Sequence, residues 1–216
     1  IRNRSDAVRC LTQLSEPNLI RSKPVVEPVV QKSLRPGPIC DPSDGELRVS
    51  WEHYHRLIEH LALQLQHAGH SFDQVVALSR GGLRVGDALS RLFKRPLVIM
   101  AGSSYGGGDG RAQEELRLGN QLAHTCEALG PKLLLVDDLV DSGDTLHASR
   151  HWLQETLQPE LIKTAVLWLK TSSRMKPDFW AMELPGNPWV VQPFERWEHL
   201  HPSQLQPLPE GSGDAP

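Results

Sequence analysis

Three carboxylates stand within five positions at the end of a run of apolar residues. The segment LLLVDDLVDSGDT, from Leu133 to Thr145, carries them at Asp137, Asp138 and Asp141. Adjacent carboxylates suit the hydroxyl groups of a sugar, or a hydrated Mg²⁺, which prefers oxygen ligands. The pattern therefore indicates a site for one of these where a buried strand ends.

The residues after these carboxylates have the composition of a phosphate-binding turn. They are Ser142, Gly143, Asp144 and Thr145, and a helical pattern covers 144–157. The start of a helix offers unpaired N–H groups and a partial positive charge, which suit a phosphate. The glycine allows close backbone approach, and the two hydroxyls add donors. A ligand that carries a diol and a phosphate a few ångströms apart is a ribose 5-phosphate.

The elements around this segment follow from the spacing of apolar residues. The predicted strands are 74–79, 95–100, 132–138, 163–169, 178–184 and 189–194, and the predicted helices are 51–68, 84–93 and 144–157. A polar, glycine-rich loop is predicted over 102–115, with a strand resuming at 116–119. The alternation predicts an open, mostly parallel α/β sheet with helices on both faces. Ligands of such sheets bind at the carboxyl ends of the strands, where the acidic pair lies.

The composition is that of an ordinary water-soluble domain. The chain has 216 residues, 39% of them hydrophobic and 23% charged, and its net charge is −3. This balance favours neither nucleic acid nor a membrane as partner, and no apolar run approaches the roughly 18 residues of a membrane span. The three widely spaced cysteines fit a reducing cytoplasm. We expect an irregular arm over 1–47, a domain over 48–206 and a flexible tail over 207–216.

The acidic segment has two other interpretations. A strand that ends in paired acids also occurs as the phospho-acceptor strand of receiver domains, but that strand opens its domain, and about 130 residues precede it here. A strand, turn and helix without any ligand is the second alternative, although it would not need three carboxylates together. The pattern G-x-x-x-x-G-K-[ST] is absent, so a P-loop is excluded.

The whole segment LLLVDDLVDSGDT resembles the signature of type I phosphoribosyltransferases, which bind 5-phosphoribosyl 1-pyrophosphate (PRPP). The motifs SRGGL, SSY and WVVQP resemble the bacterial xanthine-guanine and hypoxanthine branch, over roughly 49–200. The resemblance implies an open sheet with a small hood, Mg²⁺ as cofactor, and a homodimer or homotetramer. It also assigns the ribose 5-phosphate to Asp137, Asp138, Asp141, Ser142, Gly143, Asp144 and Thr145, and gives Asp141 the catalytic role of taking a proton from the base.

The resemblance places pyrophosphate at a second turn, formed by Ser79, Arg80, Gly81 and Gly82. Successive backbone N–H groups in such a turn converge on an anion. In the family this loop often holds a cis peptide, which here would join Ser79 and Arg80. The glycine-rich loop corresponds to a lid that excludes water from the reaction, and Arg111 in it would reach pyrophosphate. A plain surface loop is the alternative.

The base site is also implied by the resemblance. Lys170 follows a strand, as a lysine does in the purine branch, where it would donate to a purine 6-oxo group. Trp189 would stack on the base beside Val190, although a core position is an alternative for the tryptophan. Glu195 lies near where relatives carry an acidic residue close to the metal, so Asp138 and Glu195 are the predicted metal ligands.

The predicted reaction is Mg²⁺-dependent transfer of the 5-phosphoribosyl group from PRPP to a nucleobase, with a 6-oxopurine as acceptor. Val191 stands where the xanthine-guanine group can carry an acidic residue, so the resemblance does not determine which base is accepted. Two alternatives remain: a phosphoribosyltransferase for a non-purine acceptor, and a regulator that senses nucleotides or PRPP without catalysis.

Overall fold

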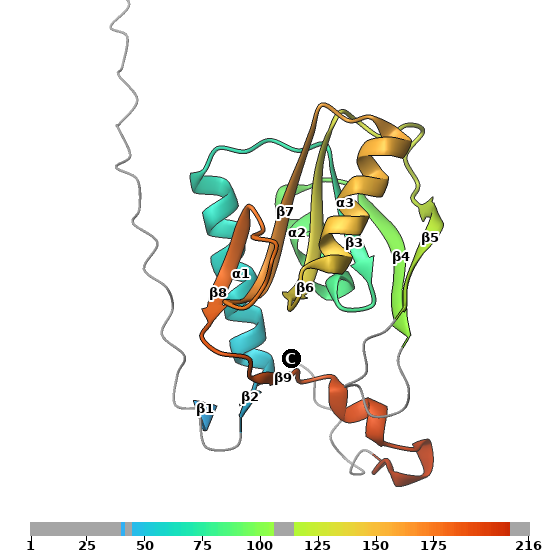
Figure 1. The fold of residues 1–216 in the computed structure, drawn as a ribbon. Helices are drawn as coiled ribbons and strands as arrows, with labels where there is room; N and C mark the ends of the chain where they lie inside the picture. The colour runs from blue at the N-terminus through green and yellow to red at the C-terminus, as the bar shows by residue number, and fades with distance from the viewer. Residues whose placement is uncertain (1–39, 42–44, 106–114, 208–216) are drawn as a thin grey trace, which may run out of the picture.

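A six-stranded, mostly parallel sheet forms the centre of the molecule (Figure 1). The computed structural model describes residues 40–41, 45–105 and 115–207. The strand order is β5-β4-β3-β6-β7-β8, and only the β4–β5 pair is antiparallel. The bounds are β3 Gln74–Ser79, β4 Leu97–Tyr105, β5 Glu115–Ala123, β6 Lys132–Val140, β7 Leu161–Lys170 and β8 Phe179–Leu184. The predicted open α/β sheet is therefore confirmed.

Three helices cover the two faces of this sheet, as predicted (Figure 1). They are α1 Trp51–His67, α2 Gly82–Phe93 and α3 Asp144–Leu157. One apolar cluster joins α1 and α2 to one face, and includes Leu57, Leu61 and Val85. A second cluster joins α3 to the other face through Leu146 and Leu153. Because both faces are covered, β3 and the first half of β6 are buried and read as continuous apolar runs.

A small second sheet forms the predicted hood beside one end of the central sheet (Figure 1). It consists of β1 Cys40–Asp41, β2 Glu46–Arg48 and β9 Trp189–Val191, with β2 and β9 parallel. The hood also includes the segment that follows β9, with two short 3₁₀ helices, η1 Glu195–His199 and η2 Pro202–Gln204. Of the predicted arm over 1–47, β1 and the start of β2 are strands, and residues 1–39 and 42–44 lie outside the described residues.

Two element predictions were wrong in part. The glycine-rich segment was predicted to be a loop from residue 102, but β4 continues through Gly102–Tyr105 and pairs with β5. These backbone hydrogen bonds outweigh the low strand propensity of glycine. The strand predicted over 189–194 ends at Val191 and belongs to the hood instead of the central sheet. Pro193 follows soon after and has no N–H to donate to a ladder.

Candidate active site

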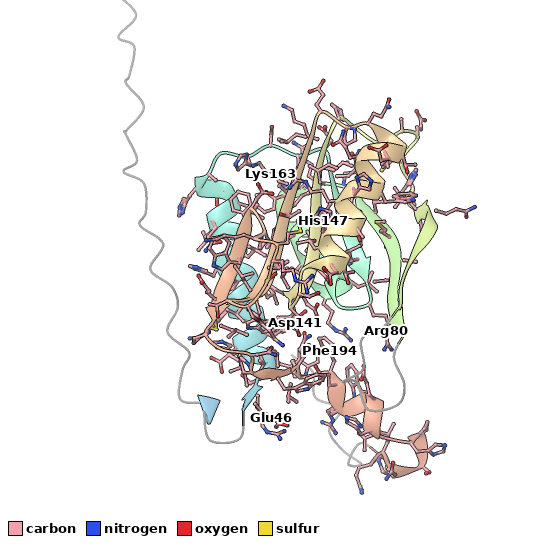
Figure 2. The ribbon with its side chains drawn as sticks, viewed as in Figure 1. Glu46, Arg80, Asp141, His147, Lys163 and Phe194 are labelled. Carbon is pink, nitrogen blue, oxygen red and sulfur yellow. The ribbon has the colours of Figure 1, made fainter. Side chains whose placement is uncertain are left out.

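A cavity of about 610 Å³ opens at the carboxyl ends of β3 and β6. The hood closes one side of it. In Figure 2, Arg80, Asp141 and Phe194 lie toward this end of the molecule, and Lys163 lies toward the other. The central-sheet side of the cavity is lined by Ser79, Arg80, Gly81, Gly102, Asp137, Asp138, Leu139 and Thr145, and the hood side by Trp189, Gln192, Phe194, Glu195 and Glu198.

The paired carboxylates of β6 both line this cavity, as predicted. Asp137 Oδ1 accepts a hydrogen bond of 2.9 Å from the backbone N–H of Asp138. Burial, and then the negative charge of Asp138, raise the pKa of Asp137 well above its ordinary value. Two adjacent carboxyl groups that are partly removed from water therefore favour a ligand that brings hydrogen-bond donors or a cation.

The turn between β3 and α2 packs directly against these carboxylates. A Cβ atom on Gly81 would lie 2.4 Å from Asp138 Oδ1, and one on Gly82 would lie 2.5 Å from the backbone oxygen of Val136. A side chain at Gly81 would displace the Asp138 carboxylate, and one at Gly82 would displace the backbone of the acidic strand. The predicted cis peptide between Ser79 and Arg80 is present. The exposed Arg80 side chain lies 3.5 Å from Glu198 of η1, so this turn also contacts the hood.

The predicted phosphate turn stands at the start of α3. Gly143 has a φ of +92° and the backbone N–H of Asp144 donates to Ser142 Oγ at 3.3 Å. The Ser142 carbonyl accepts from Ser173 Oγ and from the backbone N–H of Arg174, each at 3.1 Å. The β7–β8 connection thus holds the turn, and Thr145 lines the cavity.

Two predicted site residues that lie far apart in the sequence meet beside this turn. Lys170, the last residue of β7, places its Nζ 2.6 Å from Asp141 Oδ2. The lysine side chain is 4% exposed, whereas that of Asp141 is 57% exposed. A buried ammonium needs a charged or polar partner, and Asp141 is that partner here. The pair presents a donor and an acceptor side by side.

The hood contributes the remaining predicted residues in two different ways. Trp189 is 49% exposed and its side chain lines the cavity, so the core alternative for this residue is wrong. Val190, also predicted to bind the base, is buried in the core cluster, so its side chain is not part of the cavity wall.

Glu195 lines the cavity and accepts a 3.1 Å hydrogen bond from the backbone N–H of Gln192. Burial, together with the nearby charges of Glu198 and Asp138, raises the pKa of Glu195. Within the part of the chain that the structure describes, no group of three or more His, Cys, Asp or Glu side chains could hold a metal by itself. Arg111 lies outside the described residues.

Gln192 and Phe194 are two of the cavity residues that the sequence-based prediction missed. Gln192 donates from its amide nitrogen to Asp138 Oδ2, and Phe194 carries the guanidinium of Arg84 at 3.9 Å from its ring centroid. Both follow β9 within the segment WVVQPFE, whose tryptophan was predicted to bind the base. A polar residue at the end of a strand that leads into a site was the available signal.

Comparison with known proteins identifies the family. The phosphoribosyl transferase domain matches residues 50–199. The xanthine-guanine phosphoribosyltransferase of Idiomarina loihiensis is 31% identical over 167 residues, which cover 77% of this chain and 94% of that protein. That of Nitratidesulfovibrio vulgaris is 28% identical over 148 residues, 68% and 83% of the two chains.

Solved structures agree with this result. The purine phosphoribosyltransferase of Pyrococcus horikoshii has a TM-score of 0.58 and 26% identity, covering 69% of this chain and 93% of that chain. The xanthine-guanine-hypoxanthine phosphoribosyltransferase of Helicobacter pylori has a TM-score of 0.56 and 25% identity, with coverage of 67% and 90%. The sequence match, the sheet topology and the cavity at its carboxyl end lead to one conclusion: this chain belongs to the phosphoribosyltransferase family.

Proposed function

We propose that the protein transfers the 5-phosphoribosyl group of PRPP to a 6-oxopurine and releases pyrophosphate, as in purine salvage. The similar xanthine-guanine phosphoribosyltransferases support this acceptor class. The observation that carries the proposal is the 2.6 Å contact between Lys170 Nζ and Asp141 Oδ2.

The donor and acceptor of this pair match one edge of a 6-oxopurine. The O6 and N7 atoms are neighbours on that edge. An ammonium only donates, so Lys170 suits the O6 acceptor, and the Asp141 carboxylate suits a proton on N7. Adenine offers an amino group in place of O6, which would set two donors against each other. The pair therefore favours 6-oxopurines over 6-aminopurines.

The acidic pair and the two turns account for PRPP in this proposal. Asp137 and Asp138 face the ribose hydroxyls, the 142–145 turn receives the 5-phosphate, and the 79–82 turn receives the pyrophosphate. N9 of the base forms a bond to C1 of the ribose as the bond from C1 to the pyrophosphate oxygen breaks. Asp141 takes the N7 proton, and its charge stabilises the cationic sugar. Positioning supplies most of the acceleration, because pyrophosphate is already a good leaving group.

Magnesium fits this site as a partner of PRPP. Mg²⁺ is commonly held by one or two carboxylates together with substrate phosphates, so a set of three protein ligands is not required. Asp138 and Glu195 supply carboxylate oxygens at the cavity wall. When bound, the ion would offset the charge of the departing pyrophosphate. The raised pKa of Glu195 is consistent with a carboxyl group that a cation would help to ionise.

A base panel tests the proposal. Purified protein is given PRPP, Mg²⁺ and guanine, xanthine, hypoxanthine, adenine, uracil or orotate separately, and pyrophosphate release is followed. We expect release with at least one 6-oxopurine and not with adenine, uracil or orotate. Pyrophosphate release with uracil or orotate alone would show that the acceptor is not a 6-oxopurine. Binding of PRPP without release with any base would favour a sensor.

The assembly and the compartment belong to the same proposal. Family membership supports a homodimer or homotetramer, which sedimentation equilibrium of the purified protein tests. We also propose that the protein acts in the cytoplasm, the compartment where PRPP-dependent salvage would operate. None of the helices in the described ranges has both the length and the apolar character needed to span a bilayer.

A further inference from the structure

We propose that Gln192 is a ribose-binding residue of this site: its amide nitrogen fixes Asp138, and its amide oxygen accepts a hydrogen bond from one hydroxyl of the PRPP ribose. The inference rests on the proposed function, because it assumes that the ribose lies beside Asp138. It adds to the site a residue from the hood that no carboxylate or phosphate pattern indicates.

Gln192 is anchored at both its side chain and its backbone. It is 7% exposed and lines the cavity. Its Nε2 donates to Asp138 Oδ2, and its backbone N–H donates to Glu195 Oε1 at 3.1 Å. One residue thus joins the acidic strand β6 to the hood carboxylate. Because the Asp138 carboxylate only accepts, the orientation of the Gln192 amide follows, with nitrogen toward Asp138.

The oxygen of the same amide has no hydrogen-bond partner among the residues that the structure describes. Gln192 Oε1 is shielded from solvent, and no residue in the described part of the chain donates to it. A buried acceptor that stays unpaired is unfavourable, so such groups in native proteins commonly have a functional explanation. Since the oxygen and nitrogen belong to one planar amide, Oε1 lies next to the Asp138 contact in a residue that lines the cavity, and a small shift of the side chain on binding would bring this oxygen to the ligand.

The chemistry of PRPP decides which ligand atom suits this oxygen. At neutral pH the phosphate and pyrophosphate oxygens of PRPP are mainly acceptors, whereas its two ribose hydroxyls can donate. Asp138, which Gln192 holds, lies where the diol is proposed to bind. An amide acceptor beside a carboxylate acceptor therefore forms a pair of sites for the two hydroxyl donors of one diol.

Nucleotide binding separates a direct contact from a purely structural role. Inosine monophosphate and its 2′-deoxy and 3′-deoxy forms are titrated by calorimetry into wild type and Gln192→Met, with EDTA present so that metal-bound water is excluded. In wild type we expect each deoxy form to bind roughly 3- to 10-fold more weakly, the worth of one hydrogen bond. We call this loss of affinity the deoxy penalty. In Gln192→Met, the deoxy penalty for one of the two hydroxyls, 2′ or 3′, should disappear.

The other outcomes are distinct. If the deoxy penalty disappeared at the same hydroxyl in Gln192→Met and in Asp138→Asn, titrated in the same way, or shrank equally at both hydroxyls, Gln192 would act only through Asp138, and the direct contact would be overturned. Penalties unchanged at both positions would overturn any role in ribose binding. In steady state, the variant should raise KM for PRPP more than it lowers kcat. If wild type bound no inosine monophosphate and transferred to no base, the proposed function itself would fail, and this inference with it.

Gln74 provides the matched control. It is equally buried, at 7% exposed, and its Oε1 accepts from the Gly130 backbone N–H at 2.8 Å. It stands at the start of β3, the end of the strand away from the cavity. Gln74→Met should lower the melting temperature and leave both deoxy penalties as in wild type.

Discussion

The chemistry of the site depends on how single side chains are paired. Lys170 is almost fully buried, and an isolated ammonium in that position would be strongly unfavourable. Asp141, at 2.6 Å, neutralises it and is itself more than half exposed toward solvent. The lysine is therefore already oriented, and the exposed carboxylate could accept a proton from a base bound beside it.

Asp141→Asn tests the base role at this scale. The amide keeps the size of the side chain but cannot take the N7 proton, so we expect kcat to fall about 10²- to 10⁴-fold, the usual range for a lost general base. Steady-state rates with the best 6-oxopurine acceptor measure this. Asp87→Asn is the control, since Asp87 is an exposed partner of Arg91 on α2 and should leave kcat unchanged. Intact turnover in Asp141→Asn would remove this residue from the base role.

At the scale of elements, the 142–145 turn depends on a close fit between α3 and the β7–β8 connection. Gly143 has a positive φ, and a Cβ atom there would lie 2.6 Å from Met175 Cβ. The Ser142 carbonyl is fixed by two donors from the same connection. The proposed phosphate turn is thus held by the β7–β8 connection as well as by its own helix.

Gly143→Ala should therefore disturb both stability and phosphate binding. The positive φ alone costs an alanine about 1–2 kcal/mol, and overpacking against Met175 adds about 1–3 kcal/mol. Gly69→Ala is the matched control, because Gly69 also has a positive φ but nothing within 4 Å of its added Cβ. Urea unfolding should show the larger loss in Gly143→Ala, with a raised KM for PRPP. Equal losses in the two variants would contradict the predicted clash.

For the whole molecule, the acidic cavity predicts how stability depends on pH. The pKa of Asp137 is raised by burial and by Asp138, and that of Glu195 by burial and neighbouring acids. Such groups bind more protons folded than unfolded, so their contribution to stability is complete below about pH 4 and is lost as pH rises through their folded pKa values.

One partly buried carboxyl group, that of Asp178, has the opposite effect on stability. Burial raises the pKa of Asp178, but hydrogen bonds from Lys163 and Thr164 outweigh it and hold that pKa below its ordinary value. The contribution of Asp178 to stability is present above its ordinary pKa and is lost as the pH falls below that value. This lies outside the pH range in which the cavity acids titrate.

The variant Asp137→Asn isolates the contribution of the Asp137 carboxyl group to the pH dependence of stability. The uncharged amide keeps an oxygen to accept from the Asp138 N–H. It lacks a second acceptor for the Gly82 N–H, which adds a cost that does not depend on pH to the loss of the unfavourable charge. We expect the melting temperature of ligand-free Asp137→Asn to rise relative to that of wild type as the pH is raised from 5 to 8. Asp87→Asn, whose side chain is exposed, should differ from wild type by a constant amount across the same range. A constant difference for Asp137→Asn would contradict the prediction.

The sequence by itself determined the features that lie within one continuous segment. The carboxylates, the turn glycine and the helix start follow one another over 137–145, so chain geometry alone brings them together. The alternation of apolar runs and helical stripes likewise predicted the open sheet, because burial on both faces leaves a direct mark on composition.

Only the tertiary structure decided the contacts between distant segments. Lys170 meets Asp141 across 29 positions, Gln192 meets Asp138 across 54, and β9 leaves the central sheet to pair with β2. No local periodicity encodes these contacts, since they depend on how β7 and the hood pack against β6. The proposed base and ribose sites therefore depend on packing, whereas the proposed phosphate turn follows from local sequence.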